Sequence, residues 1–364
     1  MKHKEILSQL TAYQQGKQTQ DIQEEFGLNR IVKLASNENV YGYSPKVKHE
    51  LINHLPDLNI YPDGHTASLR TAIAKYYQVE ENQLIFGSGS EEIIQIICRA
   101  FVFAGRNTVM AANSFPQYKH NTLVEGGTVK EVPVTKEFGH DLDAMGEAID
   151  ENTSIVWICA PDNPTGTVNS EKELVAFMEQ CPKDVLVVLD EAYKEFVDEE
   201  VTLDTLTYLA SYPNLISLRT FSKAYGLAGL RIGYGIGNPE VVHSLNVVRG
   251  PFNTTSVAQN AALIALEDQA FINKTKTNND KVKRDFYKFL DSINWHYIPT
   301  QTNFIYVSTP VSGMKVFQYL TENGFIIRPG ELLGYPNSIR ITIGTEEDME
   351  LLQNILKKFN DQIR

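Results

Sequence analysis

The sequence is poor in cysteine, lacks a long hydrophobic run and has no excess of positive charge. Its three cysteines in 364 residues, Cys98, Cys159 and Cys181, form no CxxC pair. We therefore expect reduced, mostly buried thiols, as in a cytoplasmic protein. The richest apolar run, 93–104, is interrupted by polar residues and falls short of the roughly 20 apolar residues of a membrane span.

The charge balance is acidic, with 33 Lys and Arg against 45 Asp and Glu, a formal net charge of −12. This balance disfavours sequence-independent binding to nucleic acid or to anionic membranes, so we expect neither partner. The first residues, MKHKEILSQLTAYQ, lack the apolar core of a secretory signal. An anionic ligand would have to be held by basic residues gathered locally.

Short apolar segments alternate with helical patterns through the middle of the chain. Several of the apolar segments are continuous runs, which is typical of strands covered on both faces. The alternation predicts βαβ units, and so an α/β fold with a mostly parallel, mixed seven-stranded sheet covered by helices. The expected strands are 83–86, 108–112, 128–134, 154–159, 185–189, 215–219 and 232–235, and the expected helices 91–103, 115–125, 142–148 and 170–179.

The pattern changes after about residue 255. One long helix is expected from Ser256 toward Leu290, followed by strands at 304–307 and 338–343 and further helices, which together predict a smaller α+β domain. We expect a large domain over 34–255 and a small domain formed by 1–33 and 256–364. No Pro/Ser-rich linker separates them, so an extensive interface is predicted, where ligands often bind.

Two suggestive patterns carry little weight. The His49 to His54 segment resembles HExxH but is one residue too long, which places the two histidines about 140° apart on a helix. Gly233, Gly235 and Gly237 form a GxGxG run, in which the third glycine is not at the GxGxxG spacing of a dinucleotide site. These glycines are more typical of tight strand packing. We expect no metal site.

The most informative stretch is RTFSKAYGLAGLR, from Arg219 to Arg231. It follows an expected buried strand, so Lys223 lies just beyond the strand's C-terminal end, where ligands of open α/β sheets gather. A lone lysine is usually a solvated surface charge, but small and apolar residues flank this one, and a desolvated amine can form a Schiff base with a carbonyl. Thr220, Ser222 and Arg231 are donors that suit a phosphomonoester. The stretch predicts a pyridoxal-phosphate lysine.

Three other strand ends suit the same cofactor, although each also has a simpler interpretation. Asp190 ends an apolar strand; it could cap the strand or pair with a protonated pyridine nitrogen, and Tyr193 could donate to the ring's phenolic oxygen. Asn163 lies in DNPTG, which is either a plain turn or a second donor to that oxygen. The GSGSEE segment, 87–92, is either a glycine turn or a helix N-terminus that binds phosphate.

Together these residues resemble the fold-type I pyridoxal-phosphate aminotransferases, and within them the histidinol-phosphate aminotransferase family. The resemblance covers nearly the whole chain. The segments that carry it are KLASNEN (33–39), YGYSP (41–45), YPDG (61–64), DEAYKEF (190–196), RTFSKAYGLAGLRIGY (219–234), RGPFNTT (249–255), NFI (303–305) and RITIGT (340–345).

The resemblance implies a role for each matching residue. Lys223, with Asp190 and Tyr193, would be catalytic, and Lys223 would bind pyridoxal 5′-phosphate covalently. The other cofactor contacts implied are Asn163 at the phenolic oxygen, Phe115 stacked on the ring, and Ser90, Glu91, Thr220, Ser222 and Arg231 at the phosphate. Tyr61 resembles a tyrosine that reaches the phosphate in the neighbouring subunit, which implies a homodimer. The substrate contacts implied are Tyr13, Asn39, Arg328 and Arg340.

The implied activity is transfer of an amino group from histidinol phosphate to 2-oxoglutarate, with Arg328 and Arg340 holding the substrate's anionic groups. Arg328 beside Pro-Gly could equally be a surface loop charge. An aromatic amino-acid aminotransferase, or dual activity, is the main alternative, and a threonine-phosphate decarboxylase is another. A cofactor-sensing DNA-binding regulator is disfavoured by the acidic charge. Val40, Tyr43 and Ala12 replace family prolines near the substrate, so they bear on substrate preference more than on the chemistry.

Overall fold

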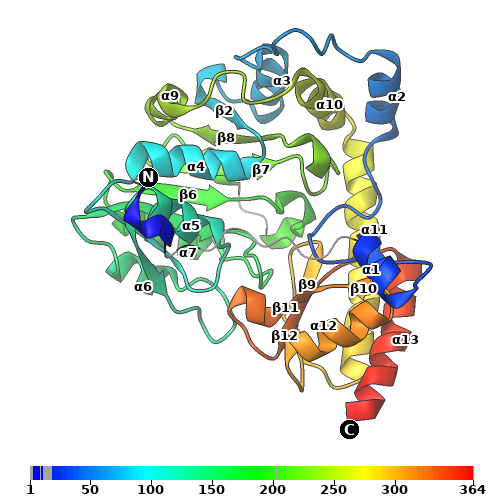
Figure 1. The fold of residues 1–364 in the computed structure, drawn as a ribbon. Helices are drawn as coiled ribbons and strands as arrows, with labels where there is room; N and C mark the ends of the chain where they lie inside the picture. The colour runs from blue at the N-terminus through cyan, green and yellow to red at the C-terminus, as the bar shows by residue number, and fades with distance from the viewer. Residues whose placement is uncertain (1–2, 9, 11–18, 202–203, 364) are drawn as a thin grey trace.

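The computed structural model describes residues 3–8, 10, 19–201 and 204–363. Its largest sheet has the strand order β2-β8-β7-β6-β5-β3-β4, in which β8 is antiparallel to both neighbours and the other pairs are parallel. The expected mixed seven-stranded α/β fold is therefore confirmed (Figure 1). The strands are β2 (Leu84–Gly87), β3 (Asn107–Ala111), β4 (Thr128–Val132), β5 (Thr153–Cys159), β6 (Leu186–Asp190), β7 (Leu215–Thr220) and β8 (Gly233–Gly237).

Successive residues of the central strands enter two different hydrophobic clusters. Along β5, Ile155 and Trp157 pack with α4, α5 and α9, whereas Val156 and Ile158 pack with α3, α6, α7 and α10. Both faces of the sheet are thus covered, which explains apolar runs without alternation. The helices of this part are α2 (Pro45–Asn53), α3 (Ala67–Tyr77), α4 (Ser90–Phe101), α5 (Gln117–Val124), α6 (Leu142–Glu147), α7 (Glu171–Gln180), α8 (Thr205–Tyr208), α9 (Pro239–Val248) and α10 (Ser256–Glu267).

A second hydrophobic core surrounds a three-stranded antiparallel sheet of order β11-β12-β9. A two-residue parallel pairing of β1 with β10 brings residues 32–33 to this smaller unit. Lys4, in contrast, contacts the Val124 carbonyl and Glu125 at the end of α5 in the large unit. The elements are α1 (Thr19–Phe26), β1 (Val32–Lys33), α11 (Gln269–Ser292), β9 (Phe304–Ser308), α12 (Gly313–Glu322), β10 (Phe325–Ile326), β11 (Arg328–Pro329), β12 (Ser338–Thr342) and α13 (Glu346–Ile363). Short 3-10 turns complete the path at Glu5–Ser8, Glu81–Gln83, Lys194–Phe196, Glu199–Val201, Ala228–Leu230 and Gly330–Leu333.

Two expected helix boundaries differ from the structure. The single helix expected from Ser256 is two helices that break at Asp268, whose carboxylate accepts a hydrogen bond from Ser44, 224 residues away. The helix expected from residue 115 begins at Gln117, after Pro116. The expected capping box of α7 is present, with Ser170 and Glu173 exchanging hydrogen bonds.

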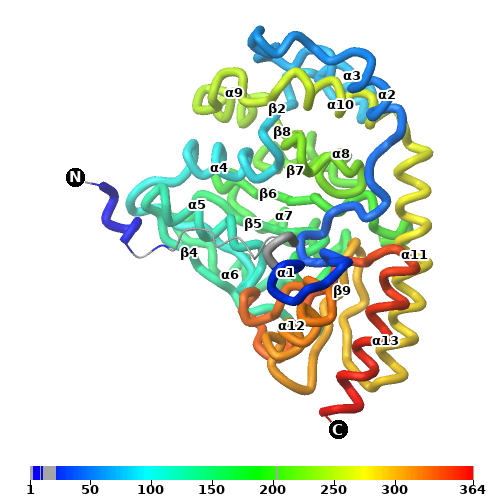
Figure 2. The backbone as a smooth tube through the Cα atoms, turned by 45° about the vertical axis from the view of Figure 1, so that its right-hand side comes forward, coloured from blue at the N-terminus to red at the C-terminus, as the bar shows by residue number. Residues whose placement is uncertain are grey.

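The domain division at 255/256 stays a prediction. In the structure the alanines of α10 pack in the core of the large unit, and α10 contacts α2 and α3. The longest described helix, α11, then runs past both units (Figures 1 and 2). Among the described helices, none is long and apolar enough to cross a membrane.

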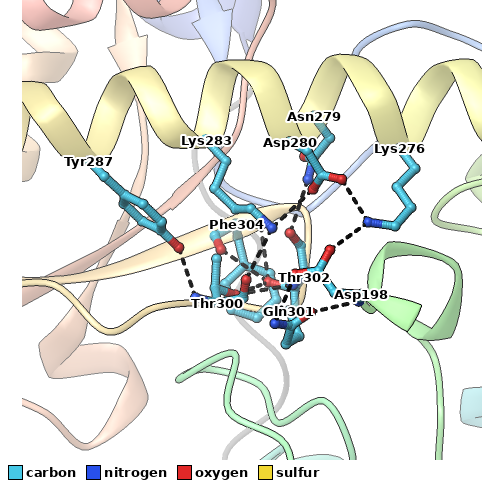
Figure 3. A network of polar contacts seen from close by, with 10 residues as sticks. All are labelled: Asp198, Lys276, Asn279, Asp280, Lys283, Tyr287, Thr300, Gln301, Thr302 and Phe304. Atoms are coloured by element: carbon cyan, nitrogen blue, oxygen red, sulfur yellow. Dashed lines mark hydrogen bonds and ion pairs between the residues drawn. The ribbon is translucent and has the colours of Figure 1, made fainter. Parts of the chain in front are cut away.

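A polar network joins α11 to Asp198 of the large unit and to the segment 300–304 of the smaller unit (Figure 3). The amine of Lys276 bridges Asp198 at 2.8 Å and Asp280 at 2.6 Å, and the buried Lys283 pairs with Asp280 at 3.0 Å. The backbone N–H of Gln301, just before β9, donates to the Gly166 carbonyl at 2.9 Å. Because Lys283 also donates to the Thr300 carbonyl at 3.3 Å, the helix, the entry to β9 and the 162–166 loop are held together.

Candidate active site

Predicted cofactor residues meet where parallel strands end. Asp190 is the last residue of β6 and Thr220 the last of β7, and these strands are neighbours in the sheet. Lys223 follows β7 by three residues, and Asn163 follows β5, the strand on the other side of β6. The structure therefore brings these residues to one edge of the sheet, as expected for an open α/β fold.

Lys223 has the environment of a reactive amine. Its Nζ donates to the Ser36 carbonyl at 3.1 Å and lies 5.6 Å from the centroid of the Tyr193 ring. Burial, with the positive charge of Arg340, lowers the pKa of Lys223 to about 8. A larger fraction of neutral amine is then present near neutral pH, and the neutral amine is the nucleophile.

Asp190 is a buried carboxylate, 3% exposed. The Tyr118 hydroxyl donates to its Oδ2 at 2.7 Å, and the backbone N–H of Ala192 donates to its Oδ1 at 3.2 Å. Burial raises the pKa of Asp190 to about 6 despite these hydrogen bonds. A buried carboxylate gains most from a cationic partner, so Asp190 fits a protonated ring nitrogen.

Two side-chain amide groups lie beside the Tyr193 hydroxyl. Asn37 Nδ2 donates to it at 2.9 Å, and Asn163 Nδ2 lies at 3.5 Å, the limit of a hydrogen bond. Asn37 was not predicted to act in the site, although it lies within the KLASNEN segment. It adopts a left-handed φ of 56°, a conformation that asparagine tolerates better than most residues.

Backbone and side-chain donors form a cup suited to a phosphate group. Ser90 and Glu91 begin α4, where backbone N–H groups lack partners within the helix. The guanidinium of Arg231 reaches this turn and donates to the Ser88 carbonyl at 3.2 Å. On the other side, the Thr220 hydroxyl donates to Ser222 Oγ at 2.9 Å. These donors fit a phosphate monoester.

Glycines allow the cup to close. Gly89, the N-cap of α4, has φ of +83°, and a Cβ there would lie 2.6 Å from the Arg231 guanidinium. A Cβ at Gly233 would lie 2.5 Å from the Ser90 backbone nitrogen. The prediction that the glycines of β8 serve close packing is confirmed, and one of them packs directly under the cup.

A buried ion pair fixes the two motif segments beside the cup. The Arg219 guanidinium contacts Glu191 Oε2 at 3.0 Å, and both side chains are almost fully buried. The hydroxyls of Ser217 and Thr205 also donate to Glu191 Oε2, at 2.5 and 2.8 Å. Because Glu191 follows Asp190 and Arg219 precedes Thr220, this network holds the ends of β6 and β7 in register.

Two predicted aromatic contacts have different surroundings. Phe115 is partly buried, and its ring meets Tyr118 edge-on with the centroids 5.5 Å apart. Tyr61 is 79% exposed and stacks on Phe252, with the centroids 4.8 Å apart. The stacking role of Phe115 and the reach of Tyr61 into another subunit stay predictions.

Two of the predicted substrate residues, Arg328 and Arg340, lie in the small unit's sheet. Arg340 donates to Asn163 Oδ1 at 2.6 Å and to the Ala35 carbonyl at 2.7 Å, so it reaches the cofactor residues. Arg328 lies opposite Arg340 in the β11–β12 register. The Asn39 amide donates to the Ala224 carbonyl at 2.8 Å, next to Lys223. Tyr13 lies outside the described residues, so its predicted substrate contact stays untested.

Comparison with known proteins agrees with this geometry. Residues 29–356 match the family model for aminotransferase class I and II. The chain is 53% identical to histidinol-phosphate aminotransferase 2 of Oceanobacillus iheyensis over 363 residues, with 100% of each chain covered. It is 50% identical to histidinol-phosphate aminotransferase of Bacillus subtilis (strain 168), covering 98% of this chain and 99% of that relative.

A solved structure has the same fold. The histidinol-phosphate aminotransferase of Sinorhizobium meliloti, in complex with pyridoxal 5′-phosphate, superposes with a TM-score of 0.90 at 26% identity, covering 100% of this chain and 98% of that one. The family match spans most of the chain, and the lysine, the buried carboxylate and the phosphate cup lie at one sheet edge. The chain therefore belongs to the class I and II aminotransferase family.

Proposed function

We propose that this chain is a pyridoxal-phosphate-dependent histidinol-phosphate:2-oxoglutarate aminotransferase of histidine biosynthesis. The observation that carries the proposal is the arrangement of Lys223, Asp190 and the phosphate cup around one sheet edge, with Arg340 of the smaller unit bonded to Asn163 and Arg328 opposite Arg340 in its sheet. Relatives about 50% identical over nearly the full chain carry this enzyme's name.

Each part of the bound cofactor has residues to hold it. Ser90, Glu91, Thr220, Ser222 and Arg231 would hold its phosphate; Tyr193 and Asn163 would hold its phenolic oxygen; Asp190 would hold its ring nitrogen; and Phe115 would cover the ring. When bound, pyridoxal phosphate supplies an aldehyde that accepts the substrate's amine and a ring that withdraws electrons from the adjacent carbon. The rest of the reaction depends on the chain's own groups.

Lys223 moves the proton in this reaction. Once the substrate amine has displaced it, its Nζ removes the proton from the amine-bearing carbon of the substrate and then returns a proton, acting as base and then as acid. Its pKa of about 8 suits both roles near neutral pH. Asp190, held anionic by its two hydrogen bonds, stabilises positive charge at the ring nitrogen.

The two arginines select the anionic groups of the substrates. Arg340, already beside Asn163, suits the α-carboxylate of glutamate and one edge of a phosphate. Arg328 adds a second positive charge for the dianionic phosphate of histidinol phosphate, which has no α-carboxylate. Asn39 and Tyr13 are further predicted contacts with the substrate.

We also propose a homodimer in the cytoplasm. The segment at 52–61 exposes Ile52, Leu58, Ile60 and Tyr61, each at least 63% exposed, and an apolar group of this kind is typical of a subunit interface. Tyr61 would then reach the phosphate cup of the partner subunit. The three cysteines are free and buried, which suits a reducing compartment.

The test is a set of half-reactions. The holoenzyme is mixed separately with histidinol phosphate, glutamate, phenylalanine, tyrosine and threonine phosphate, and loss of the cofactor's visible absorbance is followed. Conversion by histidinol phosphate and glutamate is expected. If aromatic amino acids convert the cofactor and histidinol phosphate does not, the proposed substrate is wrong. If threonine phosphate releases carbon dioxide, the proposed reaction is wrong.

A further inference from the structure

We infer that Tyr118, a residue no cofactor motif includes, is a positioning residue for the reaction, acting through Asp190. This inference rests on the proposed function, because it assigns the tyrosine a task toward a bound pyridine ring. The observation is a hydrogen bond of 2.7 Å from the Tyr118 hydroxyl to Asp190 Oδ2 between α5 and the end of β6, with both side chains buried.

Packing fixes the Tyr118 ring independently of that hydrogen bond. The ring stacks on Trp157 of β5 with the centroids 4.9 Å apart and the planes 7° apart. On another side it meets the edge-on ring of Phe115, the residue predicted to cover the cofactor. With the ring held by two aromatic neighbours, the hydroxyl is preorganised at one carboxylate oxygen.

The two hydrogen bonds orient the carboxylate of Asp190. Tyr118 occupies Oδ2 and the Ala192 backbone occupies Oδ1, which fixes rotation about the last side-chain bond. A carboxylate fixed in this way presents its remaining lone pairs in set directions, so a ring nitrogen meets it without reorganisation. Tyr118 therefore links the group that covers the ring to the group that holds its nitrogen.

The phenol also bears on the charge of Asp190. Burial raises the pKa of Asp190, and the Tyr118 hydrogen bond opposes that rise. The titratable groups around the carboxyl are Tyr118 of α5, Cys159 of β5, Glu191 and Tyr193 after β6, and Lys223 after β7. Without the phenol, the effect of burial dominates further and the pKa of Asp190 rises. Asp190 then stays protonated and neutral up to a higher pH, and it pairs less well with a protonated nitrogen.

The test compares Tyr118→Phe with the native protein and with Tyr234→Phe. Tyr234 is a matched control, since it is also fully buried and its hydroxyl bonds to another side chain, that of Tyr77, at 2.9 Å. Three quantities are measured: thermal unfolding of the apoprotein, the dissociation constant for pyridoxal phosphate added to the apoprotein, and the pH dependence of the holoenzyme's visible absorbance.

Tyr118→Phe is expected to unfold within a few degrees of the native apoprotein because the ring packing remains. Its dissociation constant for the cofactor is expected to rise about tenfold, as for the loss of one hydrogen bond to a charged group. The pH midpoint of its absorbance is expected to shift, whereas Tyr234→Phe shifts neither the dissociation constant nor the midpoint. If Tyr118→Phe does not fold, Tyr118→Met keeps most of the bulk without the donor and enters the same measurements.

A double-mutant cycle with Asp190→Asn shows whether Tyr118 acts through Asp190. Tyr118→Phe is expected to have little further effect on cofactor affinity in that background, because the carboxylate it positions is gone. Equal effects in both backgrounds would overturn the inference, as would an unchanged dissociation constant and midpoint in the single variant. A native apoprotein that fails to bind pyridoxal phosphate would instead refute the proposed function.

Discussion

Arg328 and Arg340 are direct partners across the antiparallel pair of β11 and β12. Side chains at opposed positions leave the same face of a sheet, and like charges placed there destabilise it. Within the described part of the chain, no carboxylate pairs with Arg328. Two positively charged side chains therefore start from opposed positions on one face of this sheet, an arrangement that suits an anion.

Arg328→Ala is expected to lower the kcat/KM for histidinol phosphate about 10- to 100-fold, because the proposed charge-assisted contact to the phosphate is lost. The kcat/KM for glutamate, whose α-carboxylate is proposed to bind Arg340, is expected to change by less than about threefold. Separate half-reactions with the two amines measure this ratio. Arg30→Ala, which removes a surface arginine paired with Glu347, is the control. Equal losses for both amines would contradict the two-arginine site.

Lys223→Ala is expected to bind pyridoxal phosphate but to lower turnover by at least about 1,000-fold, because the group that moves the proton is absent. Steady-state rates and cofactor titration measure the two effects. Lys288→Ala is the control, since Lys288 is an exposed lysine paired with Asp285. Substantial transamination by the alanine variant would refute the role of Lys223.

The lowered pKa of Lys223 predicts a pH effect in the apoprotein. The amine titrates at about 8 in the folded chain and near 10.5 when unfolded. The unfolded state therefore binds more protons between these values, and the contribution of Lys223 to stability rises with pH across that window. Modification of the amine by an aldehyde reagent followed by borohydride should show a midpoint near pH 8; a midpoint above 10 would contradict the lowered pKa.

Gly233→Ala is expected to lower cofactor affinity at least about tenfold, equivalent to roughly 1.4 kcal/mol. Its Cβ would meet the Ser90 backbone nitrogen at 2.5 Å and would displace the turn that begins α4. Gly229→Ala is the matched control, because a Cβ there has nothing within 4 Å. If both variants bind pyridoxal phosphate as the native protein does, α4 does not form the phosphate cup.

Leu58→Asp is expected to weaken the proposed dimer, since it places a charge in the exposed apolar segment beside Tyr61. Sedimentation of the native protein, the variant and Leu351→Asp gives the comparison; Leu351 is an exposed leucine on α13. Cofactor affinity should fall together with association if Tyr61 completes the partner's site. A native protein that sediments as a monomer would refute both proposals.

Most of the fold and of the chemical motifs could be predicted from local patterns in the sequence. The seven strands of the large sheet were predicted to within two residues at each end, most of them from short apolar runs, although β4 contains Lys130 and Glu131. Asp190 lies at the end of one strand, and Lys223 and Asn163 lie three and four residues beyond two others. The break at Asp268 was not predictable from periodicity, because the partner of its side chain, Ser44, is distant in sequence.

Asn37 and Tyr118 were missed as site residues for the same physical reason. Each acts through one hydrogen bond to a residue more than 70 positions away, Tyr193 for Asn37 and Asp190 for Tyr118. In the sequence Tyr118 lies between Gln117 and Lys119 in an expected helix, and a buried tyrosine in a helix is more often part of the core. Only the three-dimensional arrangement shows that its hydroxyl meets a carboxylate.

The position of Asn37 has a consequence for synthesis of the protein. Its backbone N–H donates to the Thr342 hydroxyl at 2.9 Å, and its carbonyl accepts from Asn303 at 3.0 Å. A growing chain forms its N-terminal parts first, yet the contact with Thr342 must wait until the last strand of the smaller unit has left the ribosome. A nascent chain can therefore contain all seven strands of the large sheet and Lys223 before Asn37, which donates to the Tyr193 hydroxyl, has its Thr342 partner.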